Sequence, residues 1–189
     1  MNAALASKGT PSDPGALSDE SLRRIDREVA KYPPDQKQSA VMSALAIAQD
    51  EKGWLSAEAM DFVARYLGMA PVAVYEVASF YAMYNLKPIG AHKITICTNL
   101  PCALQGATES AVYLKETLGI DFGQTTQDGL FTLQEGECMG ACGDAPVLLV
   151  NNKRMCSWMR AKEIDALVAE LRSRPAPMMA AGTGAADET

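Results

Sequence analysis

The chain has 189 residues, 48% of them hydrophobic, and a formal net charge of −6. This is enough for one ordinary domain or two small ones, each with a core. Five cysteines are too few for a small disulfide scaffold, and the acidic balance argues against nucleic-acid binding, which needs clustered lysine and arginine. No stretch approaches the ~20 apolar residues of a membrane span, so a cytoplasmic chain without direct membrane insertion is expected.

The first part of the chain reads as a helical bundle over residues 18–88, after a disordered arm over residues 1–17 that is rich in Pro, Ser and Gly. Ser18 and Ser56 are expected to cap helices, and Gly53 and Gly68 to end them. Apolar residues recur at three- and four-residue steps between these signals. The expected helices begin at Ser18 and stop before the YPP of residues 32–34, and then cover 39–53, 56–68 and 72–84.

The second part, residues 89–172, mixes strand and helix patterns and predicts an α/β (α+β) domain with a mixed sheet. Asn151 and Asn152 are expected to form a two-residue hairpin turn, because asparagine tolerates positive φ. Residues 173–189 are expected to be a disordered tail. The expected strands are 93–98, 129–135, 146–150 and 153–158, and the expected helices are 103–119 and 160–173.

Four cysteines carry the chemistry, and they come in two pairs. Cys97 and Cys102 lie in CTNLPC after the first predicted strand, whereas Cys138 and Cys142 lie in ECMGACGDAP after the second. Loops that leave neighbouring strands can reach one point. Four thiolates converging there predict a metal site.

The spacing leaves alternatives open for that site. Thiols stay reduced in the expected compartment, which argues against two disulfides, and a thioredoxin-type dithiol needs C-x-x-C, which neither pair has. Structural zinc is an alternative, since two to four residues between paired cysteines is normal for zinc. A [2Fe–2S] cluster also fits, because small residues would let backbone N–H groups approach its sulfides. Those residues are Gly140, Ala141, Gly143 and Ala145.

The remaining candidates have structural interpretations. A Rieske centre needs two histidine ligands, and the chain has only His92, which is expected to be an ordinary polar residue at a strand start. Cys156 is expected to be a small buried hydrophobe in the hairpin strand. The chain has no P-loop, no GxSxG and no HExxH, and no catalytic residue is predicted.

Taken together, these motifs resemble the family of thioredoxin-like [2Fe–2S] subunits of NADH:quinone oxidoreductase, respiratory complex I. The resemblance covers roughly residues 20–172 and includes both cysteine pairs as well as YPPDQKQSAVMSALAIAQDEKGWLS, VYEVASFYAMYNLKPIG and CTNLPCALQGA. It implies a helical N-terminal domain followed by a thioredoxin-like ferredoxin domain. It further implies that Cys97, Cys102, Cys138 and Cys142 ligate one [2Fe–2S] cluster.

The resemblance also implies a function and partners. The chain would be an electron-transfer subunit of an oxidoreductase, without a complete active site of its own. Its cluster would exchange single electrons with the FMN of a partner flavoprotein subunit, which binds FMN and NADH, within the peripheral arm of the complex. The chain would then lie on the cytoplasmic face of the inner membrane through its partners. An equivalent diaphorase subunit of an NAD-linked formate dehydrogenase or hydrogenase, and a zinc-stabilised interaction module, are the alternatives.

Overall fold

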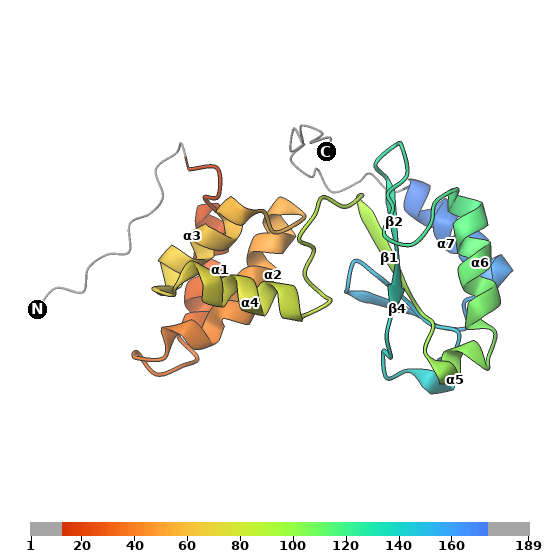
Figure 1. Ribbon diagram of the computed structural model, residues 1–189, viewed down its shortest axis with the longest axis horizontal. Helices are drawn as coiled ribbons and strands as arrows, with labels where there is room; N and C mark the ends of the chain where they lie inside the picture. Colours follow the sequence, from red (N-terminus) through yellow and green to blue (C-terminus); the bar gives the residue numbers. More distant parts are fainter. Residues whose placement is uncertain (1–12, 174–189) are drawn as a thin grey trace, which may run out of the picture. The chain divides into compact units, whose positions relative to one another are not determined.

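The computed structural model describes residues 13–173 and divides them into two compact units, residues 13–88 and residues 89–173 (Figure 1). We call these the helical unit and the sheet unit. The arm expected over residues 1–12 and the tail expected over residues 174–189 lie outside the described residues. Within residues 13–173, no helix combines the length and apolar character needed to cross a bilayer.

The helical unit packs its helices around one apolar core. The Ser18 Oγ accepts the N–H of Ser21 at 3.2 Å, and the Ser56 Oγ accepts the N–H of Ala59 at 3.2 Å, so both predicted N-caps are confirmed. Leu45 and Val63 are fully buried in the core. The elements are α1 (Asp19–Val29), the 3-10 helix η1 (Lys37–Ala40), α2 (Val41–Lys52), α3 (Ala57–Leu67) and α4 (Pro71–Phe80).

Two expectations for this unit are wrong. Residues 13–17 are not a disordered arm, because Leu17 is 7% exposed within the core and Asp13 forms an ion pair with Arg65. The fourth helix ends at Phe80, four residues earlier than predicted.

The segment after α4 turns back onto α2, which explains the early end of the helix. The Tyr84 hydroxyl donates to the Met42 carbonyl at 2.8 Å, and the Asn85 N–H donates to Oε1 of Gln49 at 2.6 Å. These contacts require extended backbone at Tyr81, which has φ −98° and ψ 123°. Tertiary hydrogen bonds therefore override the helical pattern of residues 81–84.

The sheet unit is a mixed four-stranded sheet in the order β2-β1-β3-β4. Strands β1 (His92–Cys97) and β2 (Phe131–Gly136) are parallel, whereas β3 (Leu148–Val150) is antiparallel to both β1 and β4 (Arg154–Cys156). Helices α6 (Ala107–Leu118) and α7 (Ala161–Ser173) lie on the same side of the sheet (Figure 1). The predicted mixed sheet is confirmed, and Ser173 belongs to α7 rather than to a tail.

The main core of the sheet unit lies between the sheet and these two helices. Ile94, Leu114, Leu133, Leu148 and Ile164 have no exposed surface and belong to one cluster, with contributions from β1, α6, β2, β3 and α7. This cluster closes the helix-covered face of the sheet and leaves the cysteine loops outside it.

Two local predictions for the sheet unit need correction. The helix expected over residues 103–119 is two helices, α5 (Leu100–Ala103) and α6, because Gly106 takes a left-handed φ of +95° between them. The hairpin turn has three residues rather than two, since Val150 pairs with Arg154. Asn151 and Asn152 do take positive φ, as predicted.

Candidate metal centre

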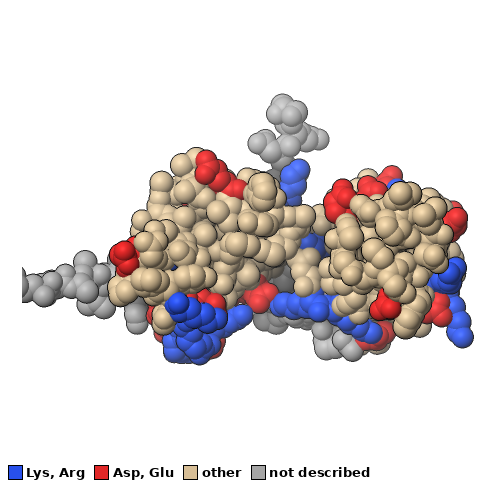
Figure 2. Space-filling view, turned by 90° about the horizontal axis from the view of Figure 1, so that it is seen from below, with Lys and Arg blue, Asp and Glu red and all other residues tan. Residues whose placement is uncertain are grey.

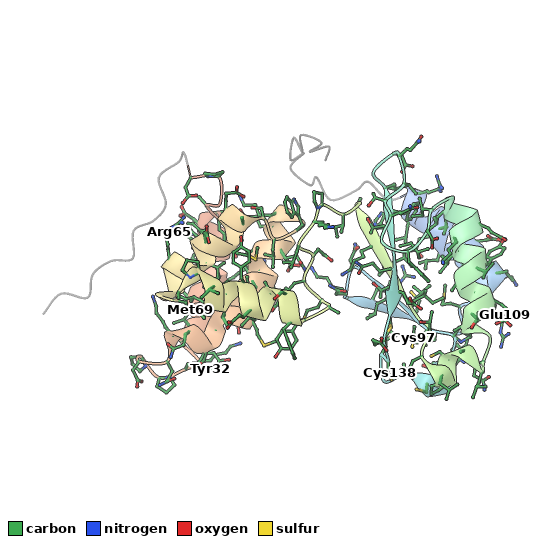
Figure 3. The ribbon with its side chains drawn as sticks, viewed as in Figure 1. Tyr32, Arg65, Met69, Cys97, Glu109 and Cys138 are labelled. Atoms are coloured by element: carbon green, nitrogen blue, oxygen red, sulfur yellow. The ribbon has the colours of Figure 1, made fainter. Side chains whose placement is uncertain are left out.

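Parallel pairing of β1 and β2 brings the two cysteine loops together. Cys97 is the last residue of β1, and its Cα partner in β2 is Gly136. Cys138 follows two residues after Gly136, so both pairs leave the sheet at the same end, where Figure 3 shows Cys97 and Cys138. The convergence expected from the sequence is a consequence of this register.

The two pairs differ in exposure. Cys97 and Cys102 are each 1% exposed and form a small cluster with Ala107, Ala145 and Val147. Cys138 and Cys142 are exposed. The centre therefore has a buried pair on the β1–α5 side and an exposed pair on the β2–β3 side.

All five cysteines of the chain are free thiols, and two of those in the centre, Cys102 and Cys142, have raised pKa values. Burial, followed by contact with the neighbouring Cys97 and by the charges of Cys97 and Cys142, raises the pKa of the Cys102 thiol to about 11. Burial also raises the pKa of Cys142, followed by contact with Cys138 and the charge of Cys97. Crowded thiols without a cation resist deprotonation, whereas a bound metal deprotonates its thiol ligands outright. Metal binding here must release protons.

Side chains next to the cysteines tie the two loops to each other. The Thr98 hydroxyl donates to Oε1 of Glu135 at 2.7 Å, directly beside Cys97. The Asn99 Nδ2 donates to Oε2 of Glu137 at 3.5 Å, directly beside Cys138. These two bonds connect the β1–α5 loop with the end of β2 and fix the separation of the cysteine pairs.

The exposed pair also has internal support. Gly140 has φ +72°, which glycine adopts without strain, and its N–H donates to the Sγ of Cys138 at 3.4 Å. Hydrogen bonds from backbone N–H groups to cysteine sulfur stabilise the thiolate form and help set the reduction potential of a cluster.

A third support comes from the loop between β4 and α7. The Asp144 carbonyl accepts the N–H of Trp158 at 2.8 Å, and its carboxylate accepts the Ser157 hydroxyl at 3.2 Å. The Pro146 carbonyl accepts the N–H of Met159 at 2.9 Å. These bonds hold the segment that follows Cys142 against a part of the chain thirteen or fourteen residues further on.

Of these supporting residues, sequence reasoning named only Gly140 and did not find the others. Thr98 and Glu137 each lie next to a predicted ligand in the sequence, and this adjacency is the signal that could have identified them. Ser157 and Trp158 gave no signal, because their role depends on β4 returning beside β3.

The two remaining candidates lie where the sequence predicted. His92 begins β1, is 5% exposed and has its ring centroid 5.8 Å from that of Phe131. Cys156 ends β4, is 8% exposed and belongs to the main core of the sheet unit. Neither belongs to the small cluster that contains Cys97 and Cys102.

Comparison with known proteins identifies the architecture. The family model described as thioredoxin-like [2Fe–2S] ferredoxin matches residues 25–172. The chain belongs to this family. The thioredoxin-like [2Fe–2S] domain expected from the sequence is therefore confirmed.

Curated relatives agree over most of the chain. Subunit 2 of the NADH-quinone oxidoreductase of Thermus thermophilus is 41% identical over 79% of this chain and 82% of its own length. A subunit of the NADH-quinone oxidoreductase of Rickettsia bellii is 40% identical over 77% of this chain and 87% of its own length. The mitochondrial NADH dehydrogenase [ubiquinone] flavoprotein 2 of Dictyostelium discoideum is 44% identical over 76% of this chain. The matched part is 57% of the length of that relative.

A solved structure shares the fold. The crystal structure of an NAD+-reducing [NiFe]-hydrogenase in its H2-reduced state matches 76% of this chain with a TM-score of 0.63. Its sequence identity is 24%, and the matched part is 24% of that longer chain. This likeness concerns the fold alone.

The cofactor of the family is a [2Fe–2S] cluster, and the thiols of this chain fit such a cluster. A [2Fe–2S] cluster takes four cysteine thiolates, two at each iron. The contacts between thiols follow these pairs, Cys97 with Cys102 and Cys138 with Cys142, while the charges of Cys142 and Cys97 also act between the pairs. Within residues 13–173, no three His, Cys, Asp or Glu side chains already lie close enough to hold one metal ion.

Proposed function

We propose that Cys97, Cys102, Cys138 and Cys142 hold one [2Fe–2S] cluster. The observation that carries this proposal is the pairing of free thiols at the ends of two parallel strands. Cys97 and Cys102 would hold the iron on the buried side, and Cys138 and Cys142 the iron on the exposed side. When bound, such a cluster takes up and gives back one electron.

We further propose that the chain is the electron-transfer subunit of an NADH:quinone oxidoreductase. It would exchange single electrons with the FMN of a partner flavoprotein subunit that also binds NADH, inside the peripheral arm of the complex. The support is the family membership and the 40–44% identity to relatives named as subunits of this class of enzyme. The alternative of a hydrogenase diaphorase has only a likeness of fold in its favour.

The chain's own residues would set the properties of the centre. The small apolar cluster around Cys97 and Cys102 excludes water from the buried side. Thr98 with Glu135 and Asp144 with Ser157 hold the loops in place, so that little rearrangement accompanies a change of charge. The nearby carboxylates disfavour an added negative charge and would keep the reduction potential low.

The location follows from the partners in this proposal. The chain would lie at the cytoplasmic face of the inner membrane, attached through other subunits of the complex. Fractionation of cells that carry a tagged chain tests this, because the chain should sediment with membranes and be released when the peripheral arm is detached.

The first experiment is a metal and spectroscopic analysis of the chain purified without oxygen. We expect about two irons and two sulfides per chain, and an EPR signal that appears only after reduction with dithionite. In the intact complex, NADH should produce the same signal through the flavoprotein. A colourless protein that holds zinc, and cannot be reconstituted with iron and sulfide, would contradict the cluster. A cluster that NADH cannot reduce in the complex would contradict the electron-transfer role.

A further inference from the structure

Met139 is the one long apolar side chain between the two exposed cysteines. It is half-buried and packs against the small cluster that contains Cys97 and Cys102. An alanine or valine side chain is too short to extend over a neighbouring loop, whereas the unbranched thioether of methionine fills irregular gaps. Met139 can therefore reach further across the buried pair than the other apolar residues there, which are Ala107, Ala141, Ala145 and Val147.

The end of β2 makes room for the Met139 side chain. A Cβ on Gly136 would lie 3.0 Å from Cε of Met139 and 2.7 Å from Cγ2 of Thr95. Both separations are shorter than the roughly 3.5–4.0 Å of a favourable carbon–carbon contact. Gly136 is also the strand partner of Cys97. The terminal methyl group of Met139 thus lies where β1 and β2 end, beside the residue that pairs with Cys97.

The loop between the exposed cysteines turns Met139 inward. Gly140 has φ +72°, and a Cβ there would meet no atom of the described residues within 4 Å, so this position faces open space. Its neighbours on either side, Met139 and Ala141, both pack against the small cluster. The Gly140 N–H donates to the Cys138 Sγ at 3.4 Å, which holds the turn. The loop therefore exposes its cysteines while its apolar side chains cover the buried pair.

A cover of this kind acts on the charge of the centre. Four thiolate ligands make a [2Fe–2S] centre anionic, and reduction adds one electron without forming or breaking a bond. Water stabilises the more highly charged reduced form, whereas apolar surroundings disfavour it. Solvent exposure is accordingly among the features that set the reduction potentials of such clusters. Removal of an apolar cover should therefore raise the potential.

Surface charge acts differently from an apolar cover. On the face drawn in Figure 2, basic and acidic side chains lie next to each other on both units, and salt screens charges at a surface. Beside the cysteine loops, the carboxylates of Glu135 and Glu137 accept hydrogen bonds from the β1–α5 loop. Met139 carries no charge, so its influence should not depend on ionic strength. Salt therefore separates the two influences.

We propose that Met139 closes the buried cysteine pair to water and thereby keeps the reduction potential of the centre low. Its side chain is held for this role by the room that Gly136 leaves and by the turn at Gly140. Met139 is not a ligand and acts by excluding solvent. This inference rests on the proposed function, because the potential is that of the cluster in that proposal.

The first test measures the midpoint potential of the cluster-loaded full chain by a redox titration followed by EPR. Met139→Ala should favour the reduced form about tenfold at a fixed ambient potential, which is a rise of about 59 mV for a one-electron couple. Met139→Gln keeps the length of the side chain but adds a polar amide, so it should shift the potential in the same direction. Met139→Leu restores an apolar side chain of similar volume and should leave the potential close to that of the unmodified chain.

Two controls accompany this titration. Met155→Ala is the matched control, because Met155 is 41% exposed in β4 and lies outside the small cluster, and it should leave the potential unchanged. The rise caused by Met139→Ala should be the same at low and at high salt, since it comes from solvent access rather than from charge. A rise that disappears at high salt would contradict this cause.

The second test needs no cluster. The full chain is treated with a chelator, checked for retained helix content by circular dichroism, and alkylated with iodoacetamide at neutral pH. Met139→Ala should increase the rates at Cys97 and Cys102 about tenfold, because burial is what keeps these thiols inert. Met139→Leu and Met155→Ala should stay within about twofold of the unmodified chain. Mass spectrometry of the peptides gives each rate separately.

The outcomes distinguish this inference from the proposed function. If Met139→Ala and Met139→Gln change neither the potential nor the alkylation rates, the inference is wrong and the proposed function stands. Faster alkylation with an unchanged potential would also overturn the inference, since Met139 would then cover the thiols without tuning the centre. If the unmodified chain cannot be loaded with a cluster, the proposed function fails and the inference about the potential fails with it.

Discussion

The helical unit and the sheet unit use their polar side chains differently. In the helical unit, polar groups such as Ser18 and Ser56 cap helices around a single apolar core. The sheet unit has a comparable main core and, apart from it, a small cluster in which two of the five members are cysteines. The segments that confer stability are therefore distinct from the loops that carry the chemistry.

The contrast has a physical origin. A core is stabilised by any well-packed apolar side chains, whereas a metal centre needs particular atoms at particular positions. The proposed ligands lie on the loops after β1 and β2, where parallel strands end at one edge and side-chain hydrogen bonds connect the loops. The following predictions test whether stability and chemistry are as separate as this comparison suggests.

The largest effect is expected from loss of a ligand. Cys97→Ser, Cys102→Ser, Cys138→Ser and Cys142→Ser should each abolish or grossly alter the visible absorption and the EPR signal. Cys156→Ser is the matched control, because Cys156 belongs to the main core rather than to the small cluster, and its spectrum should be unchanged. If Cys156→Ser loses the visible absorption while one of the other four variants keeps it, the proposed ligand set is wrong.

Truncation in the two cores should reduce stability without directly removing ligands. Leu45→Ala in the helical unit and Leu133→Ala in the sheet unit should each cost about 2–5 kcal/mol, since both side chains are fully buried. Trp54 lies in the helical unit and Trp158 in the sheet unit, so fluorescence during denaturation can follow each unit when the other tryptophan is replaced by Phe.

The iron content of folded Leu45→Ala distinguishes the outcomes. We expect it to match that of the unmodified chain, because Leu45 belongs to the core cluster of the helical unit. If Leu45→Ala both destabilises the helical unit and lowers the iron content, the two units do not act separately.

Removal of the cluster should reveal the difference in exposure between the cysteine pairs. After chelation, iodoacetamide at neutral pH should modify Cys138 and Cys142 about tenfold faster or more than Cys97 and Cys102, because buried thiols react slowly. Modification of Cys102 should accelerate up to about pH 11, the value to which burial raises its pKa. Mass spectrometry of the peptides measures these rates, and equal rates for both pairs would contradict the asymmetry.

The smallest effect concerns alkaline pH and the helical unit. Burial, followed by the neighbouring Tyr81, raises the pKa of Tyr84 from 10.0 to about 12. The folded state therefore holds this proton more tightly, and the resulting stability is complete below pH 10 and is lost as pH rises through 12.

Tyr84→Phe tests this pH dependence. The variant loses the hydrogen bond to Met42 and should be about 1 kcal/mol less stable at neutral pH. Its stability should decline less than that of the unmodified chain between pH 10 and pH 12. Denaturation curves of both proteins across this range provide the comparison, and identical pH slopes would rule out the contribution of Tyr84.

Much of the local structure could be predicted because its signals are local. Ser18, Ser56 and Gly68 act through hydrogen bonds or backbone angles within one turn of helix, so the sequence was sufficient to place these helix ends. The positive φ of Asn151 and Asn152 was predictable for the same reason. The errors arose where distant contacts compete, as at Tyr81, where bonds from the following residues to α2 end the helix early.

The sequence by itself determined the thioredoxin-like [2Fe–2S] class through the resemblance of its motifs to that family, since the cysteine spacings alone left structural zinc open. Only the tertiary structure decided that Cys97 and Cys102 are buried while Cys138 and Cys142 are exposed, because burial depends on which segments pack over a loop. It also decided that Asp144 meets Trp158, since strand pairing returns β4 beside β3. Composition and spacing predict the ligand atoms, whereas their surroundings depend on contacts between residues far apart in the chain.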